Sequence, residues 1–231
     1  MTTTEPIALP VAHPAGTTVS ALLLLPAAAR AVFVFAHGAG AGMSHPFMTA
    51  IAEQLAERGV ATFRYQFPAM ERGSRRPDPP AVAQATARAA VAEAARRLPE
   101  LPLFAGGKSF GGRMTSQAQA ESPLAGVKGL VFLGFPLHPA NRPSLDRAQH
   151  LTRISLPLLF LQGARDALAT PELLTGVIAS LGSRATLELV ADADHSFHVP
   201  ARGRRSNAQV QAALCDTIAG WMAARSAGTP R

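Results

Sequence analysis

The sequence predicts an α/β fold with a mostly parallel, twisted sheet that helices cover on both faces. The first observation is an alternation of leucine-rich or β-branched apolar runs with alanine-rich stretches of helical character. Buried parallel strands have such near-continuous apolar runs, and helices connect them. The second is a length of 231 residues, which suits one domain with a sizeable core. No internal repeat, linker or domain boundary appears, so we expect a single domain over residues 1–231.

Seven apolar runs bounded by turn residues are predicted as strands. They are Thr18–Leu25, Ala31–Ala36, Ala61–Tyr65, Leu101–Ala105, Gly129–Leu133, Leu158–Gln162 and Thr186–Val190. The segment Ile7–Pro10 is expected to pair with the first of them, as an antiparallel hairpin at one edge of the sheet. Five stretches are predicted as helices. They are Pro46–Arg58, Pro80–Leu98, Ser109–Glu121, Pro171–Leu181 and Asn207–Arg225.

Two proline-containing segments interrupt the alternation, Gln66–Pro80 and Phe135–His150. Each leaves the carboxyl end of a predicted strand, which is the edge at which open α/β sheets bind ligands. They are therefore candidates for the walls of a substrate pocket. Plain surface excursions are the alternative interpretation.

The composition excludes several classes of protein. A hydrophobic content of 48% argues against disorder, and the single cysteine, Cys215, excludes an intramolecular disulfide framework. Cys215 lies in an apolar helical pattern that predicts a buried packing residue. The N-terminus lacks the basic and apolar regions of a signal peptide, and the apolar run 21–36 is interrupted by Pro26 and Arg30. We expect a soluble cytoplasmic protein, a monomer or homodimer without a membrane partner.

The formal net charge is +7, almost all of it from arginine. Nucleic-acid binding would favour basic residues interleaved with aromatic ones, or a known binding motif. Aromatic residues make up only 6% and no such motif appears, so no nucleic-acid partner is expected. The seven histidines are scattered, without a His-x-x-x-His pair, and we expect no metal and no other cofactor.

The segment Gly107-Lys108-Ser109-Phe110-Gly111 lies where a predicted strand gives way to a predicted helix. Gly-x-Ser-x-Gly at such a junction is typical of a nucleophile elbow, a turn so tight that the serine's neighbours must be small. Phosphate-binding loops also contain Gly-Lys-Ser, but they have glycine five residues before that Gly, where Pro102 stands. The pattern predicts Ser109 as a catalytic nucleophile.

A serine hydroxyl needs a base, and the base needs an acidic residue to orient it. In this architecture the acid and then the histidine follow the serine along the chain. Asp166 comes just after the predicted strand Leu158–Gln162, and His195 comes just after Thr186–Val190. The order and the strand ends predict a triad of Ser109, Asp166 and His195.

Neighbouring residues compete for two of these roles. We favour His195 over His198 because it lies nearer the strand end and follows an aspartate. Asp192 and Asp194 are interpreted as residues that shape the loop, because Asp166 reaches the histidine from a separate strand end.

Acyl transfer also requires backbone N–H groups that stabilise an oxyanion. One donor is expected from Phe110, the residue after the nucleophile, and the second from Ala39, with Gly40 as the alternative. Gly38, Gly40 and Gly42 are spaced two apart, which does not fit the Gly-x-Gly-x-x-Gly of a dinucleotide loop. His37, just before this loop, is expected to hold it through hydrogen bonds.

Together, the segment His37–Gly40, the elbow around Ser109, Asp166 and His195 resemble the α/β-hydrolase superfamily over nearly the whole chain. The segments Gly106–Arg113, Gly134–Pro139 and Leu161–Asp166 are similar to its dienelactone-hydrolase-like branch. That branch includes small bacterial hydrolases and relatives that serve as scaffold subunits of chromatin-modifying complexes. The resemblance implies a compact hydrolase with little or no lid. Dienelactone hydrolases proper carry a cysteine nucleophile where this chain has Ser109, which argues against dienelactone as the substrate.

The sequence therefore predicts a serine hydrolase of ester, thioester or amide bonds, with a small acyl molecule as substrate. The alternative is a non-enzymatic interaction module on a hydrolase scaffold, because a fold does not fix a function. An intact set of Ser109, Asp166 and His195 favours the enzyme, since a pure scaffold has no need of all three.

Overall fold

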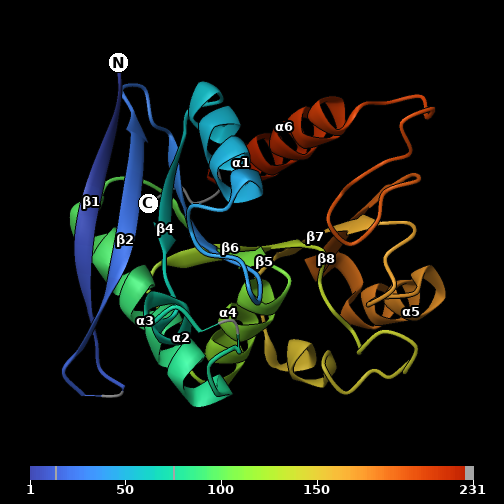
Figure 1. Cartoon of the computed structure of the whole chain (residues 1–231), viewed down its shortest axis with the longest axis horizontal. Helices are drawn as coiled ribbons and strands as arrows, with labels where there is room; N and C mark the ends of the chain where they lie inside the picture. The colour runs from blue at the N-terminus through green and yellow to red at the C-terminus, as the bar shows by residue number, and fades with distance from the viewer. Residues whose placement is uncertain (14, 75, 227–231) are drawn as a thin grey trace.

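A computed structural model describes residues 1–13, 15–74 and 76–226 of the chain (Figure 1). Within these residues, eight strands form one sheet in the order β1-β2-β4-β3-β5-β6-β7-β8. The strands are β1 Thr2–Val11, β2 Thr17–Pro26, β3 Ala31–Ala36, β4 Val60–Tyr65, β5 Leu103–Lys108, β6 Val127–Leu133, β7 Leu158–Gly163 and β8 Ala185–Val190. From β4 to β8 every neighbouring pair is parallel. The predicted fold class is confirmed.

The antiparallel part of the sheet is the hairpin of β1 and β2 at one edge, which Figure 1 shows beside β4. Ile7 pairs with Ala21, as the predicted hairpin requires, but β1 extends well beyond the predicted segment. β5 also departs from its prediction, because it runs on through Gly106 and Gly107. Glycine weakens an isolated strand. Here, a Cβ atom at Gly106 would collide with the backbone of Val131 in β6, so the strand needs glycine there.

Helices cover both faces of the sheet. They are α1 Pro46–Glu57, α2 Pro68–Glu71, α3 Pro80–Arg97, α4 Phe110–Glu121, α5 Pro171–Leu181 and α6 Asn207–Ser226. Four of the six begin at a proline, whose fixed φ suits the first helical position and whose missing N–H is not needed there. The helix α2 lies in the first proline-containing segment, and a 3₁₀ turn at Gln149–Arg153 begins at the end of the second; both are absent from the sequence prediction.

Two hydrophobic cores lie on opposite faces of the sheet. Along β3, Val32 and Val34 pack into one core, and Phe33 and Phe35 pack into the other. The helices α3 and α4 close the first core, and α1 and α6 close the second (Figure 1). This two-sided burial explains why the strand sequence is apolar at every position.

The sixth helix carries the single cysteine. Cys215 is fully buried, as a packing residue should be, and burial raises the pKa of its thiol to about 12. No helix in the described part of the chain combines the length and apolar character needed to cross a membrane.

Candidate active site

The turn between β5 and α4 has the geometry of a nucleophile elbow. Ser109 has φ 49° and ψ −115°, in a region that non-glycine residues rarely adopt. Such a conformation costs on the order of 1–3 kcal/mol and persists only where the surroundings enforce it. A Cβ atom at Gly107 would collide with the backbone of Ala36, and one at Gly111 would collide with that of His37. The two glycines therefore let the elbow lie directly against the end of β3.

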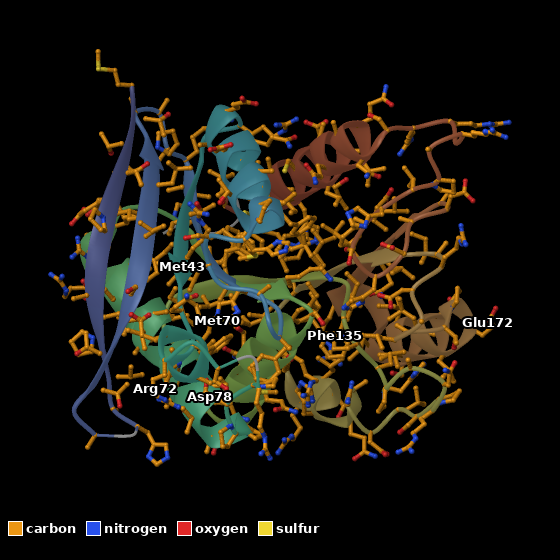
Figure 2. All side chains as sticks on the ribbon, in the orientation of Figure 1. Met43, Met70, Arg72, Asp78, Phe135 and Glu172 are labelled. Atoms are coloured by element: carbon orange, nitrogen blue, oxygen red, sulfur yellow. The ribbon has the colours of Figure 1, made fainter. Side chains whose placement is uncertain are left out.

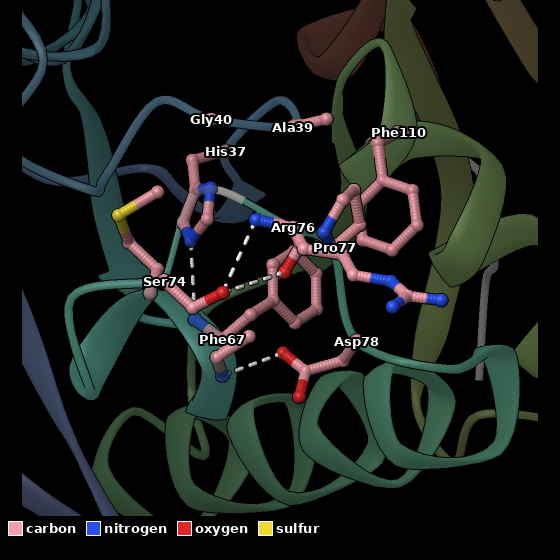
Figure 3. Close-up of a pocket in the computed structure, with 11 residues that line it drawn as sticks. His37, Ala39, Gly40, Phe67, Ser74, Arg76, Pro77, Asp78 and Phe110 are labelled. Atoms are coloured by element: carbon pink, nitrogen blue, oxygen red, sulfur yellow. Dashed lines mark hydrogen bonds between the residues drawn. The ribbon is translucent and has the colours of Figure 1, made fainter.

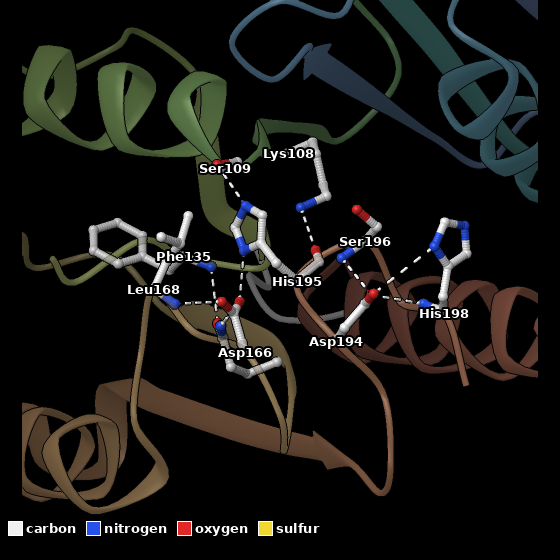
Figure 4. A network of polar contacts seen from close by, with 10 residues as sticks. Lys108, Ser109, Phe135, Asp166, Leu168, Asp194, His195, Ser196 and His198 are labelled. Carbon is white, nitrogen blue, oxygen red and sulfur yellow. Dashed lines mark hydrogen bonds and ion pairs between the residues drawn. The ribbon is translucent and has the colours of Figure 1, made fainter. Parts of the chain in front are cut away.

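The three residues predicted as a triad are joined by hydrogen bonds (Figure 4). His195 Nδ1 lies 2.6 Å from Asp166 Oδ2, and His195 Nε2 lies 2.9 Å from Ser109 Oγ. An ionised carboxylate can only accept, so Nδ1 carries the proton and Nε2 is free to accept from the serine hydroxyl. The arrangement can remove a proton from Ser109 and leave the resulting positive charge beside Asp166.

Asp166 is 3% exposed and its carboxylate is saturated with donors. Oδ1 accepts from the N–H of Leu168 at 2.8 Å, and Oδ2 accepts from the side-chain amide of Gln162 in addition to His195. Together these bonds hold the carboxylate in one fixed orientation. Asp166 is therefore positioned independently of His195, as an orienting residue needs to be.

The loop between β8 and α6 carries His195 and has its own internal supports. Asp194 Oδ1 accepts from the N–H groups of Ser196 and His198 at 2.8 and 2.9 Å, and Asp192 adopts a positive φ of 60°. Both aspartates shape the loop, as the sequence suggested. The imidazole of His198 is exposed and 3.8 Å from the Asp194 carboxylate, away from Ser109.

The residues predicted to supply oxyanion donors lie on the other side of Ser109. Phe110 is the first residue of α4, where a helix leaves its N–H groups without intrahelical partners. Ala39 and Gly40, in the loop after β3, line the same small hollow as the Phe110 side chain (Figure 3). The structure thus brings both predicted segments to the elbow.

His37 fixes the start of this loop (Figure 3). Its Nε2 accepts from the N–H of Phe67 at 3.1 Å, so Nδ1 carries the proton and donates to the carbonyl of Gly38 at 2.8 Å. Burial lowers the pKa of His37, which favours the neutral ring that this bonding pattern requires. The expectation that His37 holds the loop by hydrogen bonds is confirmed.

A second support of the same loop could not be found from the sequence. The N–H of Met43 donates to Gln66 Oε1 at 2.8 Å, and the Met43 carbonyl accepts from Arg64 Nη1 at 3.0 Å. Arg64 lies near the end of β4 and Gln66 directly follows it, so the neighbouring strand fastens the middle of the loop. No local pattern signals such a contact, because the partners are more than 20 residues apart in sequence.

A cleft of about 750 Å³ opens beside Ser109 and His195. Much of its wall is apolar and comes from the loop after β3, the first turns of α1 and the segment after β7. Those apolar residues are Ala39, Ala41, Pro46, Phe47, Met48, Ala50 and Leu168. The cleft can therefore accept an apolar group next to the serine hydroxyl.

The two proline-containing segments do not line this cleft, so the prediction of pocket walls is wrong for the main cavity. Gln66–Pro80 instead packs beside His37, where the buried carboxylate of Asp78 accepts from the N–H of Ala69 at 2.7 Å. Figure 2 shows Asp78 together with Arg72, whose guanidinium lies 3.8 Å from it.

The segment Phe135–His150 lies against α4 instead of the cleft. His150 Nε2 is 2.8 Å from Ser116 Oγ, and burial lowers the pKa of His150 to about 4. The segment thus packs on α4, the helix that follows the elbow, and not on the cleft.

Lys108 is a further residue of the site that the sequence analysis did not single out. It lines the cleft, and its Nζ donates to the carbonyl of His195 at 2.7 Å (Figure 4). In the described ranges, no group of three or more His, Cys, Asp or Glu side chains is arranged to hold a metal ion.

Comparison with known proteins places this geometry in a family. Residues 29–223 match the model of the alpha/beta hydrolase domain. A dienelactone hydrolase from Anabaena variabilis superposes with a TM-score of 0.77 at 19% identity, over 97% of this chain and 98% of that one.

Two further structures show the same fold. A serine hydrolase without a lid from Xanthomonas campestris has a TM-score of 0.74 at 21% identity, over 98% of this chain and 97% of that one. The protein Est1E from Butyrivibrio proteoclasticus, solved with ferulic acid bound, has a TM-score of 0.70 at 16% identity, over 91% and 96%. At these identities the likeness establishes the fold and not the substrate.

Proposed function

The chain belongs to the α/β-hydrolase family, and we propose that it is a serine hydrolase of ester, thioester or amide bonds in a small acyl substrate. The observation that carries the proposal is the continuous chain of hydrogen bonds from Asp166 through His195 to Ser109. Family membership supports hydrolysis in general, and this geometry supports a serine nucleophile.

The proposed reaction has two halves. In the first, Ser109 Oγ attacks the substrate carbonyl carbon while His195 Nε2 takes the hydroxyl proton. The tetrahedral intermediate collapses, His195 gives its proton to the leaving group, and an acyl-enzyme remains on Ser109. In the second half, a water molecule repeats the attack with His195 as base, and the acid leaves.

The remaining residues would act on charge that develops during these steps. Asp166 would stabilise the imidazolium form of His195 and hold its tautomer. The N–H groups of Phe110 and Ala39 would donate to the oxyanion, with Gly40 as the alternative to Ala39. The fold holds all of these groups in place before the substrate arrives, so little reorganisation is required.

The cleft supports an uncharged, apolar acyl group. Its wall beside Ser109 is apolar, and its one lysine or arginine, Lys108, already donates to His195. Each methylene group transferred from water is worth about 0.8 kcal/mol. We therefore expect kcat/KM to rise from p-nitrophenyl acetate to the hexanoate, and to be lower for a succinyl half-ester. The variant Phe47→Ala should weaken the preference for hexanoate more than it weakens acetate turnover.

The decisive test is the variant Ser109→Ala with p-nitrophenyl esters as substrates. Turnover should fall by about 1,000-fold or more, towards the uncatalysed rate, while the circular dichroism spectrum and Tm are retained. A fluorophosphonate probe should label the wild type and not the variant. Unchanged turnover in Ser109→Ala would contradict the proposal. Well-folded wild type that the probe does not label and that hydrolyses no p-nitrophenyl ester would favour the alternative, a non-enzymatic interaction module.

A further inference from the structure

Lys108 stands out in the composition because lysine is rare in this chain. Of the 22 basic residues, Lys108 and Lys128 are the only lysines, and all the others are arginine. Lys108 ends β5 and directly precedes Ser109. The position directly before the serine of the elbow therefore holds one of two lysine side chains in an otherwise arginine-based protein.

Three groups lie close to the ammonium group of Lys108 at the wall of the cleft. Its Nζ donates to the carbonyl of His195 at 2.7 Å and lies 5.6 Å from the ring centroid of Phe197. On the third side is Gly134, just after β6, where a Cβ atom would come within 2.9 Å of Nζ and 3.4 Å of His195 Cε1. Gly134 therefore leaves the room that the ammonium group occupies.

Charged groups from two other elements face Lys108. Asp166, after β7, and Asp194, in the β8–α6 loop, both attract its positive charge, although no carboxylate of the described residues lies within 4.0 Å of Nζ. Gly134 contributes only backbone, and His195 contributes its carbonyl. Burial is the largest influence and lowers the pKa of Lys108 to about 8.

We propose that Lys108 is a positioning residue: its ammonium group fastens the backbone of the base, His195, to the strand that ends in the nucleophile, Ser109. This proposal rests on the proposed function for the roles of His195 and Ser109. The two residues are 86 positions apart in sequence, and each comes from its own strand end. One side chain next to Ser109 thus sets the distance between them, and the bond is stronger while the lysine is charged.

The test is the pH dependence of kcat/KM for p-nitrophenyl butyrate in wild type, Lys108→Met and Lys128→Met. At pH 7, Lys108→Met should lose about tenfold in kcat with little change in KM, because the base is less well placed. The wild type should lose part of its activity as pH rises through about 8, when Lys108 gives up its proton. This alkaline decline should be absent from Lys108→Met and present in the matched control Lys128→Met.

Stability separates positioning from a merely structural role. The pKa of Lys108 is about 8, below the ordinary value of 10.5. The charged form therefore destabilises the folded chain below pH 8, and this destabilisation is lost as pH rises from about 8 to 10.5. Replacing Lys108 by methionine removes that cost together with the hydrogen bond. We expect the Tm at pH 7 to change by no more than about 3 °C. A large fall in Tm that parallels the loss of activity would overturn the proposal.

Two readouts keep this inference separate from the proposed function. Amide hydrogen exchange across residues 193–198 requires no turnover and should be faster in Lys108→Met than in wild type. Lysine-labelled NMR of the wild type gives the pKa of Lys108 directly, and this value should coincide with the alkaline decline. Wild-type kcat in Lys108→Met, unchanged exchange, or a decline that does not match the Lys108 titration would each overturn it.

Discussion

On one side of Ser109, two hydrogen bonds that involve a charged side chain hold His195, one with the carboxylate of Asp166 and one from the ammonium group of Lys108. On the other side, His37, Phe67 and Phe110 are held by neutral hydrogen bonds and ring contacts, and the expected donors are backbone N–H groups. In the proposed reaction, the first side accepts a proton, whereas the second only keeps its shape. The difference suggests that charge changes should damage the first side and packing changes the second.

The largest effect should come from removing charge on the base side. Asp166→Asn keeps the shape of the side chain but can place a donor where His195 Nδ1 needs an acceptor. We expect kcat to fall by about 1,000- to 10,000-fold with KM little changed, measured by steady-state hydrolysis of p-nitrophenyl butyrate. Asp194→Asn is the matched control, because an amide oxygen can still accept from Ser196 and His198. Equal losses of kcat in the two variants would show that activity does not depend on the charge of Asp166 in particular.

On the other side of Ser109, a substitution that changes no charge should be damaging. His37→Phe leaves the buried N–H of Phe67 without its acceptor, which costs about 1–3 kcal/mol of unfolding free energy. A shift of the loop that carries Ala39 should also lower kcat by about 10- to 100-fold. Urea unfolding and steady-state kinetics measure the two effects. Normal kcat in a destabilised variant would show that His37 supports the fold without positioning the loop.

Acid should remove the contribution of His37 to stability. Its pKa is lowered in the folded chain, so the unfolded chain binds the proton more readily below pH 6.5. Stability from the neutral ring is therefore present above pH 6.5 and is lost as pH falls towards the folded pKa. The difference in unfolding free energy between wild type and His37→Phe should shrink over this range. A difference that stays constant down to pH 4 would contradict a neutral, acceptor role for His37.

The smallest effect should follow from replacing the ring of Phe67 by a smaller apolar side chain. Phe67 lies edge-on to both His37 and Phe110, with ring centroids 4.8 and 5.4 Å apart. Phe67→Leu keeps the side chain apolar and should cost about 1–2 kcal/mol, with only a few-fold loss in kcat. Thermal unfolding and p-nitrophenyl butyrate kinetics measure both. A loss as large as that of His37→Phe would mean that packing outweighs the hydrogen bond.

The base side was largely predictable from the sequence because its residues follow strand ends. Asp166 and His195 lie in the loops that follow β7 and β8, and parallel strands present those ends at one edge. The elbow was predictable because its steric demands leave a glycine pattern. The starts of two helices were also predictable from the sequence, because Pro46 and Pro171 occupy first helical positions.

The supports around the site were not predictable, because they depend on contacts between distant segments. Lys108 reaches the carbonyl of a residue 87 positions away, and Arg64 reaches Met43 from a neighbouring strand. The segment Gln66–Pro80 resembles an exposed loop in composition. Its buried Asp78 and the short helix α2 instead hold it beneath His37, away from the cleft.

The positive φ of Ser109 makes the residue that the proposed catalysis requires unfavourable for the stability of the fold. Glycine adopts that conformation without strain, so Ser109→Gly should relieve backbone strain at the cost of all chemistry. Laboratory evolution of this chain for heat resistance alone would therefore favour losing the serine. Under the proposed function, a requirement for turnover would maintain the serine at this position, and a selection scheme that monitors both properties would keep it.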